Sequence, residues 1–267
     1  MDSNKLRIIV TTICLVFVLA CKGNDPKPKL ELPSIEGRKV LMVYGGWEGH
    51  QPDVFTERVS KWLTEDGAIV TISDSLGVYT DKEIMDNTDL IIQYWTMGQI
   101  SQEQFQGLET AVRNGTGLAG CHGGLGDSFR NSPEYQYMIG GQWVAHPGGK
   151  IKNYSVHIVD SNDPVSRGIE DFRMKNTEQY YMHIDPNIKV LATTKFTDSI
   201  HPWIKDHVIP VSWKTYYGDG RVFYLSIGHA PNDFNTPQAK ALLLRGIKWA
   251  SGSKYLPKEK TLQAKYE

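Results

Sequence analysis

The sequence feature that most constrains the fold is the octapeptide Gly-Leu-Ala-Gly-Cys-His-Gly-Gly, which covers residues 117–124. Its centre has the Gly-x-His-x-Gly spacing of a nucleophile elbow, with His122 in the place of the nucleophile. Small residues flank that place because a sharp turn from a strand into a helix leaves no room for a Cβ atom and often needs a positive φ. The octapeptide therefore predicts an open α/β sheet with His122 at its carboxyl edge, where such folds bind ligands.

The residue type at the elbow indicates the chemistry. A serine or a cysteine there would predict acyl transfer, whereas a histidine favours proton transfer or metal ligation. Cys121 lies one residue away and is expected to point back into the fold. The alternative interpretation is a glycine-rich strand end whose histidine merely caps the next helix.

In the first half of the chain, apolar runs typical of buried strands alternate with amphipathic segments typical of helices. The expected strands are residues 39–44, 68–72, 89–95 and the elbow strand, and the expected helices cover residues 54–63, residues 80–85 and a segment that Ser101 opens. Strands that are almost wholly apolar and alternate with helices predict a parallel sheet covered on both faces. We therefore expect an α/β fold with a mostly parallel, doubly wound sheet.

The second half is less regular and is expected to add antiparallel strands. The expected strands are residues 155–159, 189–192, 208–213 and 221–225, some of them joined by tight turns such as residues 217–220. Residues 235–250 have the apolar spacing of a closing helix. Without an internal repeat or a change in composition, we expect one domain over residues 38–253 and a polar tail over residues 254–267.

The N-terminus has the pattern of a targeting segment followed by a tether. Lys5 and Arg7 precede an apolar run, residues 8–20, that is short for a membrane span. The run ends in Val-Leu-Ala-Cys, which resembles the signal box of bacterial lipoproteins and implies a signal peptide over residues 1–21 with a lipid on Cys21. An ordinary secretory signal and a short anchor are the alternatives. Residues 22–37 are polar and contain prolines, as a tether does.

The charge of the chain argues against nucleic-acid binding, and its cysteine content argues against an intrachain disulfide. The chain has 29 basic and 30 acidic residues and a net charge of −1, so it has no basic footprint for nucleic acid. Cys14 falls in the expected signal peptide and Cys21 carries the expected lipid, which leaves Cys121 without a partner for an intrachain disulfide. Lys22 follows Cys21, and the resemblance then implies a cell-envelope protein of the outer membrane, on its periplasmic or surface face, that touches the membrane only through its lipid.

Polar side chains follow glycine-rich or aromatic segments where expected strands end. They are His50, His122, His146, Glu178 and His229. Each alone has a plain explanation, such as a solvated loop histidine or a carboxylate at a helix start. Loops after the first strand and after the elbow strand are neighbours in doubly wound sheets, so His50 and His122 are expected to face one pocket. The recurrence of such residues at strand ends favours a functional role for the whole set. The remaining histidines are expected to be structural or to lie on the surface: His157, His183, His201 and His207.

The same motifs, in this order and spacing, resemble the ThuA-like (trehalose-utilisation) family over residues 38–252. The resemblance rests on the Gly-Gly pair before His50, the elbow, Gly-Gly-Gln-Trp-Val-Ala-His-Pro at 140–147, Asp-Pro-Val-Ser-Arg-Gly at 163–168, Glu-Gln-Tyr-Tyr at 178–181 and the run over 210–229. It implies a class I glutamine amidotransferase-like, flavodoxin-like fold, with histidine where those enzymes carry cysteine. It also implies a sugar-linked role, with a sugar oxidoreductase that makes 3-keto sugars as a partner in the pathway.

The hypothesis we prefer is an enzyme that acts on an oxidised (3-keto) glycoside or disaccharide. A ketone at C3 acidifies the C2 proton, so a base can trigger loss of the substituent at C1. An imidazole with its ordinary pKa of about 6.5 is largely neutral near pH 7 and suits this task. We expect His122 to be the base or a metal ligand, and His229 or Glu178 to be the acid that protonates the leaving oxygen. Cys121 is on the wrong side of the elbow for amidase chemistry.

Substrate-binding groups are expected around these residues. Backbone N–H groups of the glycines could stabilise an enolate oxygen, and aromatic rings could stack on a sugar. The expected binding residues are Gly45, Gly46, Trp47, His50, Gly123, His146, Tyr180 and Tyr181.

Two alternatives stay open. A divalent metal such as zinc is one, because histidines together with a glutamate are a normal ligand set. The candidate ligands are His50, His122, His146 and His229, although no close i, i+4 pair marks a site. The other alternative is a sugar-binding lipoprotein without turnover, in which the histidines hydrogen-bond sugar hydroxyls.

Overall fold

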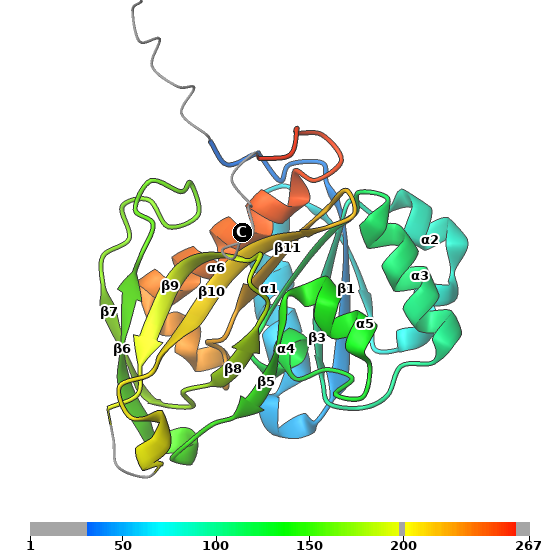
Figure 1. Ribbon diagram of the computed structural model, residues 1–267. Helices are drawn as coiled ribbons and strands as arrows, with labels where there is room; N and C mark the ends of the chain where they lie inside the picture. The colour runs from blue at the N-terminus through cyan, green and yellow to red at the C-terminus, as the bar shows by residue number, and fades with distance from the viewer. Residues whose placement is uncertain (1–30, 198–200, 260–267) are drawn as a thin grey trace, which may run out of the picture.

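A nine-stranded sheet runs through the protein in the computed structural model, which describes residues 31–197 and 201–259 (Figure 1). The strand order is β2-β1-β3-β4-β11-β10-β9-β6-β7. In chain order its strands are β1 (Lys39–Gly46), β2 (Ile69–Ser73), β3 (Leu90–Thr96), β4 (Gly117–Cys121), β6 (Lys152–Ile158), β7 (Phe172–Thr177), β9 (Lys189–Lys195), β10 (Val208–Tyr217) and β11 (Gly220–Leu225). A separate antiparallel pair joins β5 (Gly141–Ala145) to β8 (Tyr181–Ile184).

Helices cover both faces of the parallel half of the sheet. The helices are α1 (Pro52–Glu65), α2 (Lys82–Asn87), α3 (Gln102–Arg113), α4 (Gly123–Gly126), α5 (Pro133–Ile139) and α6 (Pro237–Ser251). Helices α1 and α6 pack with alternate β1 and β3 side chains on one face, and α2, α3 and α5 pack on the other (Figure 1). Strands buried on both faces are almost wholly apolar, which is the pattern their sequences show.

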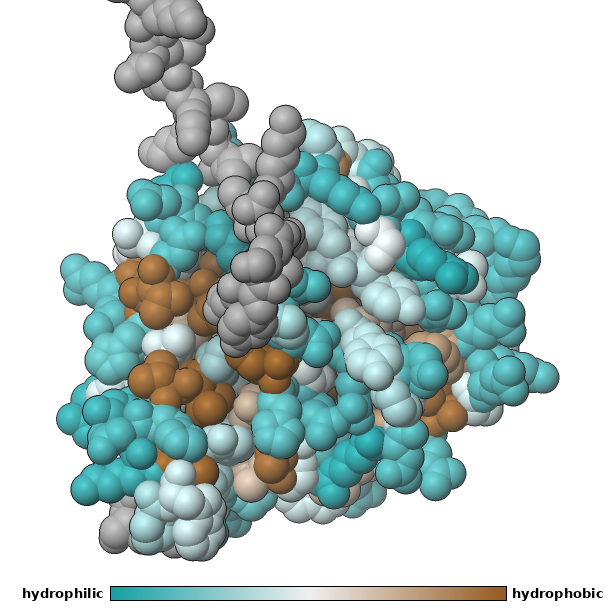
Figure 2. Space-filling model, in the orientation of Figure 1, coloured by the Kyte–Doolittle hydropathy of each residue, from teal (hydrophilic) through white to brown (hydrophobic). Residues whose placement is uncertain are grey.

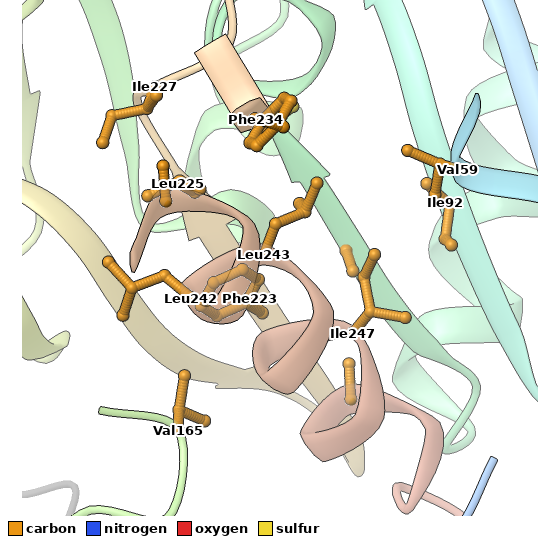
Figure 3. Close-up of a cluster of buried hydrophobic side chains, with 14 of the residues drawn as sticks. Val59, Ile92, Val165, Phe223, Leu225, Ile227, Phe234, Leu242, Leu243 and Ile247 are labelled. Atoms are coloured by element: carbon orange, nitrogen blue, oxygen red, sulfur yellow. The ribbon is translucent and has the colours of Figure 1, made fainter. Parts of the chain in front are cut away.

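Helix α6 anchors the core of the first face. Its residues Leu242, Leu243 and Ile247 are fully buried and lie against Phe223 and Leu225 of β11 (Figure 3). Burying a leucine or isoleucine side chain contributes roughly 1.5–3 kcal/mol. This packing holds β11, the central strand of the sheet, in place.

The direction of the strands decides which loops meet. Strands β1, β3, β4 and β11 pair in parallel, so they end at one edge of the sheet. From β11 the sheet continues through antiparallel pairs to β10, β9, β6 and β7. These four reversals return β7 to the direction of β11. The end of β7 therefore faces the same edge as the ends of the parallel strands.

The expected fold class is confirmed: the sheet is mostly parallel in the first half, has helices on both faces and gains antiparallel strands in the second half. Ser101 opens α3 with a capping box, in which its side chain accepts from the backbone of Gln104 and the Gln104 side chain accepts from the backbone of Ser101. Strands β5, β7 and β8 and helix α5 were not expected from the sequence; each is short, with four to seven residues.

Both ends of the expected domain pack more closely than a tether and a polar tail suggest. Ile35, in the expected tether, is 1% exposed and belongs to the core. Glu259, in the expected tail, lies 2.9 Å from the fully buried Nζ of Lys214 and accepts a hydrogen bond from the Trp249 indole. Cys21 and the expected signal peptide lie outside the described residues, and so do residues 22–30 and 260–267.

On the face that Figure 2 shows, hydrophilic residues cover α2 and α3, whereas hydrophobic residues gather in the half that Figure 1 draws as antiparallel strands.

Within residues 31–197 and 201–259, no helix combines the length and the apolar character that crossing a membrane requires.

Candidate active site

Three histidines and one glutamate meet at the shared edge of the sheet. His50 ends the short 3-10 helix η1 (Glu48–His50) after β1, His122 follows β4, Glu178 follows β7, and His229 comes four residues after β11. One potential ligand atom from each of the four lies within 4.8 Å of the others. We call this set the histidine–glutamate cluster. Its members come from four separate segments, as the topology of the strand ends requires.

His122 occupies the elbow and is held at both ring nitrogens. Its backbone has φ 48° and ψ −139°, which is the strained turn that the glycine-rich octapeptide predicts. The side chain is fully buried; Nδ1 lies 2.8 Å from the carbonyl oxygen of Ser226 and Nε2 lies 3.1 Å from Oε2 of Glu178. The Tyr180 ring stacks on the imidazole, with the ring centres 3.9 Å apart. The His122 ring is thus held in one orientation by contacts at both ring nitrogens and on one face.

His50 is also buried, at 2% exposure, and its Nδ1 lies 2.8 Å from the hydroxyl oxygen of Thr96. Its ring centre is 4.7 Å from that of His122 and 5.3 Å from that of His229. Burial lowers the pKa of His50 to about 3, and repulsion from the other two histidines adds to the shift. His50 is therefore a neutral imidazole at physiological pH.

Glu178 faces three histidines. Besides His122, its carboxylate lies 3.4 Å from Nδ1 of His229 and 3.9 Å from Nε2 of His146. Burial by itself raises the pKa of Glu178, but the neighbouring imidazoles of His122 and His229 outweigh burial and lower it. The carboxylate is therefore ionised at neutral pH, which suits an electrostatic or ligating role and argues against the expected role as an acid.

Buried hydrogen bonds fix the loops that carry the cluster. The Tyr94 hydroxyl donates to the carbonyl of Gly228 at 2.7 Å and lies 3.4 Å from the carbonyl of His50. The Thr177 hydroxyl donates to Asp233 at 2.7 Å, which joins the end of β7 to the segment after His229. Because a buried hydroxyl needs a partner, these bonds restrict where the loops can lie.

The rim of the cluster is partly open. The His146 side chain is 43% exposed, the His229 side chain is 14% exposed, and Trp47 is 46% exposed with its ring edge-on to His50 at 4.7 Å. Tyr180 is 3% exposed and lies beneath this rim, stacked on His122. Tyr181 does not share this setting, because its ring contacts are with His183, Phe196 and His207.

The three glycines predicted at the site are close-packed. A Cβ atom on Gly46, which has φ 78°, would lie 2.0 Å from the carbonyl oxygen of Thr96, and one on Gly45 would overlap the ring of Trp95. A Cβ atom on Gly123 would lie 2.6 Å from Cε1 of His50. These glycines allow β1 to approach β3 and allow His50 to approach α4.

Sequence reasoning missed three groups that position the cluster: Thr96, Tyr94 and the Ser226 carbonyl. Thr96 and Tyr94 had a usable signal, because they lie at the end of an expected strand that neighbours the elbow strand. The Ser226 carbonyl had none, since any residue supplies the same backbone group. His157, which was expected to be structural or to lie on the surface, is exposed and pairs with Asp171.

Cys121 is fully buried, and burial raises its pKa well above the ordinary range of a thiol. A nucleophilic cysteine needs a lowered pKa and access to substrate. The structure therefore supports the expectation that Cys121 points into the fold.

The fold and the histidine–glutamate cluster define an α/β protein with a candidate functional site at the carboxyl ends of its parallel strands. The family model ThuA, described as trehalose utilisation, matches residues 39–250. The chain belongs to the ThuA family, which indicates a carbohydrate-related function.

Solved structures support the same fold. A putative ThuA-like protein from Bacteroides uniformis is 18% identical, with a TM-score of 0.66 over 84% of this chain and 94% of that chain. One from Parabacteroides merdae is 18% identical, with a TM-score of 0.65 over 85% and 94% of the two chains. A cytoplasmic protein from Salmonella typhimurium is 13% identical, with a TM-score of 0.54 over 82% and 100%. The comparison with curated proteins gives no match.

Proposed function

We propose that the histidine–glutamate cluster is the active centre of an enzyme that processes an oxidised (3-keto) glycoside. The observation that carries the proposal is the convergence of His50, His122, His229 and an ionised Glu178 beside a partly open rim. The carbohydrate-related function of the family supports a sugar as the substrate. Clusters of titratable groups at a strand edge with perturbed pKa values are typical of catalytic sites.

The reaction follows from the chemistry of the ketone. A base takes the C2 proton, and the electron pair of the C2–H bond forms an enolate over C2, C3 and the ketone oxygen. The enolate then re-forms the ketone as a C1–C2 double bond forms and the C1–O bond breaks. The departing oxygen takes a proton, so the products are an enone and an alcohol, and addition of water to the enone would complete a hydrolysis.

The structure favours the rim histidines for proton transfer. His122 is fully buried and both its ring nitrogens are occupied, so it is poorly placed to reach a substrate proton. His146 and His229 reach the surface and lie within 3.9 Å of Glu178. The exposed ring of Trp47 offers a face on which a sugar can stack.

Proton NMR of the full-length chain in detergent, mixed with a 3-keto glucoside or with its unoxidised parent, tests the proposal. We expect turnover of the keto sugar alone, with a loss of about 10²–10⁴-fold in His146→Gln and full activity in the control His157→Gln. Binding of either sugar without turnover would contradict the proposal and favour a sugar-binding protein.

We also propose that a lipid on Cys21 holds the enzyme at the cell envelope, which the mass of the mature N-terminus would test.

A further inference from the structure

We infer that the histidine–glutamate cluster is a divalent-metal site, with His50, His122, Glu178 and His229 as its ligands. The inference deepens the proposed function, since it concerns the same site. It rests on the geometry of the cluster, and metal binding can be measured without any sugar.

The first argument comes from the hydrogen bonds of His122. A carbonyl oxygen only accepts, so the ring nitrogen that faces Ser226 at 2.8 Å must be the N–H donor. In the neutral ring, Nε2 then carries the lone pair and points at a carboxylate oxygen of Glu178 3.1 Å away. A cation placed between a ring nitrogen and a carboxylate oxygen at this distance can bind both atoms.

The second argument comes from the spacing of the rings. Around a tetrahedral ion with metal–nitrogen bonds of about 2.0–2.1 Å, neighbouring ligand atoms lie about 3.4 Å apart and ring centres about 5 Å apart. The ring centres of the three histidines are 4.7, 5.3 and 5.7 Å apart. Glu178 oxygens lie 3.1 Å from Nε2 of His122 and 3.4 Å from Nδ1 of His229. The cluster is therefore close to the size of a ligand shell.

The third argument comes from the groups behind the ligands. Metal-binding histidines usually place their second ring nitrogen against a carbonyl or another polar group, which fixes the ring. His122 has the Ser226 carbonyl in this place, and His50 has the Thr96 hydroxyl. The buried Nδ1 of His229 lies near the Glu178 carboxylate but makes no well-aligned hydrogen bond. A buried polar nitrogen left unpaired is costly unless it binds something, and a metal ion would supply that partner.

Three imidazoles and one carboxylate suit zinc and the other later first-row divalent ions rather than calcium or magnesium. If it took the C3 ketone oxygen as a fifth ligand, a bound ion would act as a Lewis acid and so acidify the C2 proton. With His229 as a ligand, His146 is the rim histidine that remains for proton transfer.

The test is metal binding by the full-length chain in detergent, freed of metal with a chelator and titrated with Zn²⁺ and with Co²⁺. We expect one equivalent of tightly held Zn²⁺ and the visible absorption of a four- or five-coordinate Co²⁺ site. Glu178→Gln should weaken Zn²⁺ binding by more than 10-fold, and Thr96→Val, which removes only the support of His50, by about 10–100-fold. The exposed control His157→Gln should bind as the wild type does.

Less than one equivalent of Zn²⁺, or equal affinity in the wild type, Glu178→Gln and Thr96→Val, would overturn the inference. Circular dichroism of each variant separates loss of the site from loss of the fold. Tight metal binding without turnover of any keto sugar would leave the metal site standing and refute the proposed function. Turnover of the keto sugar by a protein that binds neither Zn²⁺ nor Co²⁺ in the titration would support the proposed function and overturn the metal site.

Discussion

Gly123→Ala should disable the site without unfolding the protein. The new Cβ atom would lie 2.6 Å from Cε1 and 2.9 Å from Nδ1 of His50, and 3.0 Å from Cγ2 of Thr96. Carbon atoms in contact keep about 3.5–4.0 Å apart, so the His50 ring must move by about 1 Å. A displacement of about 1 Å in a catalytic group costs about 10²-fold in rate. We expect a loss of that size in keto-sugar turnover and weaker Zn²⁺ binding.

The stability of this variant should change little. Gly123 is the first residue of α4 and has no positive φ, so alanine suits its backbone and gains roughly 0.5–1 kcal/mol. That gain offsets part of the local crowding. Urea denaturation, keto-sugar turnover and Zn²⁺ titration should be measured side by side, with Gly77→Ala as a control because its Cβ atom would meet only Ser75 Oγ, at 3.2 Å. Turnover and Zn²⁺ affinity within 3-fold of the wild type, in a folded protein, would refute the reasoning.

Other perturbations test other parts of the structure. Asp163→Asn leaves the fully buried ammonium of Lys214 with one carboxylate. The substitution should therefore lower the free energy of unfolding by about 3–5 kcal/mol and the Tm by about 6–20 °C. The exposed control Asp206→Asn should leave the Tm unchanged. Burial alone would raise the pKa of Asp163, but the charge of Lys214 and hydrogen bonds from neighbouring lysines lower it. The Asp163 carboxylate therefore stabilises the fold above about pH 4, and urea titrations should show this contribution lost as the pH falls through the lowered pKa, in the wild type but not in Asp163→Asn. Trp47→Ala should raise the KM for keto sugar by about 3–10-fold without changing the Tm; an unchanged KM would exclude stacking. His146→Gln should lower kcat while leaving Zn²⁺ affinity intact, and a parallel loss of both would make His146 a ligand.

The parallel half of the fold could be predicted from the sequence because its signals are local. Most of the strands are largely apolar runs, and the side chains of Ser101 and Asp81 cap the starts of helices. Strands β5 and β8 escaped detection because they are only five and four residues long, and β7 because it is a mostly polar stretch of six residues. A short segment has little periodicity to read.

Within the candidate site, the glycine-rich elbow predicted the strained backbone of His122, and adjacent strand ends predicted that His50 and His122 face one pocket. The structure adds Glu178 and His229 to this pair. The sequence could not show that Glu178 belongs among the possible ligands ahead of His146. That distinction depends on the four antiparallel pairings between β11 and β7, which make the two strands run in the same direction and end on the same side of the sheet. Pairings between distant strands leave no mark on either strand alone.

Exchange of the C2 proton of a 3-keto glucoside in D₂O tests the central claim most directly, because it detects proton abstraction even where no C1–O bond breaks. In proton NMR, the account predicts that the wild-type protein replaces the C2 proton with deuterium, that Glu178→Gln does so at least 10²-fold more slowly, and that the unoxidised glucoside keeps its C2 proton. A wild-type protein that binds the keto sugar and leaves its C2 proton in place would contradict the account.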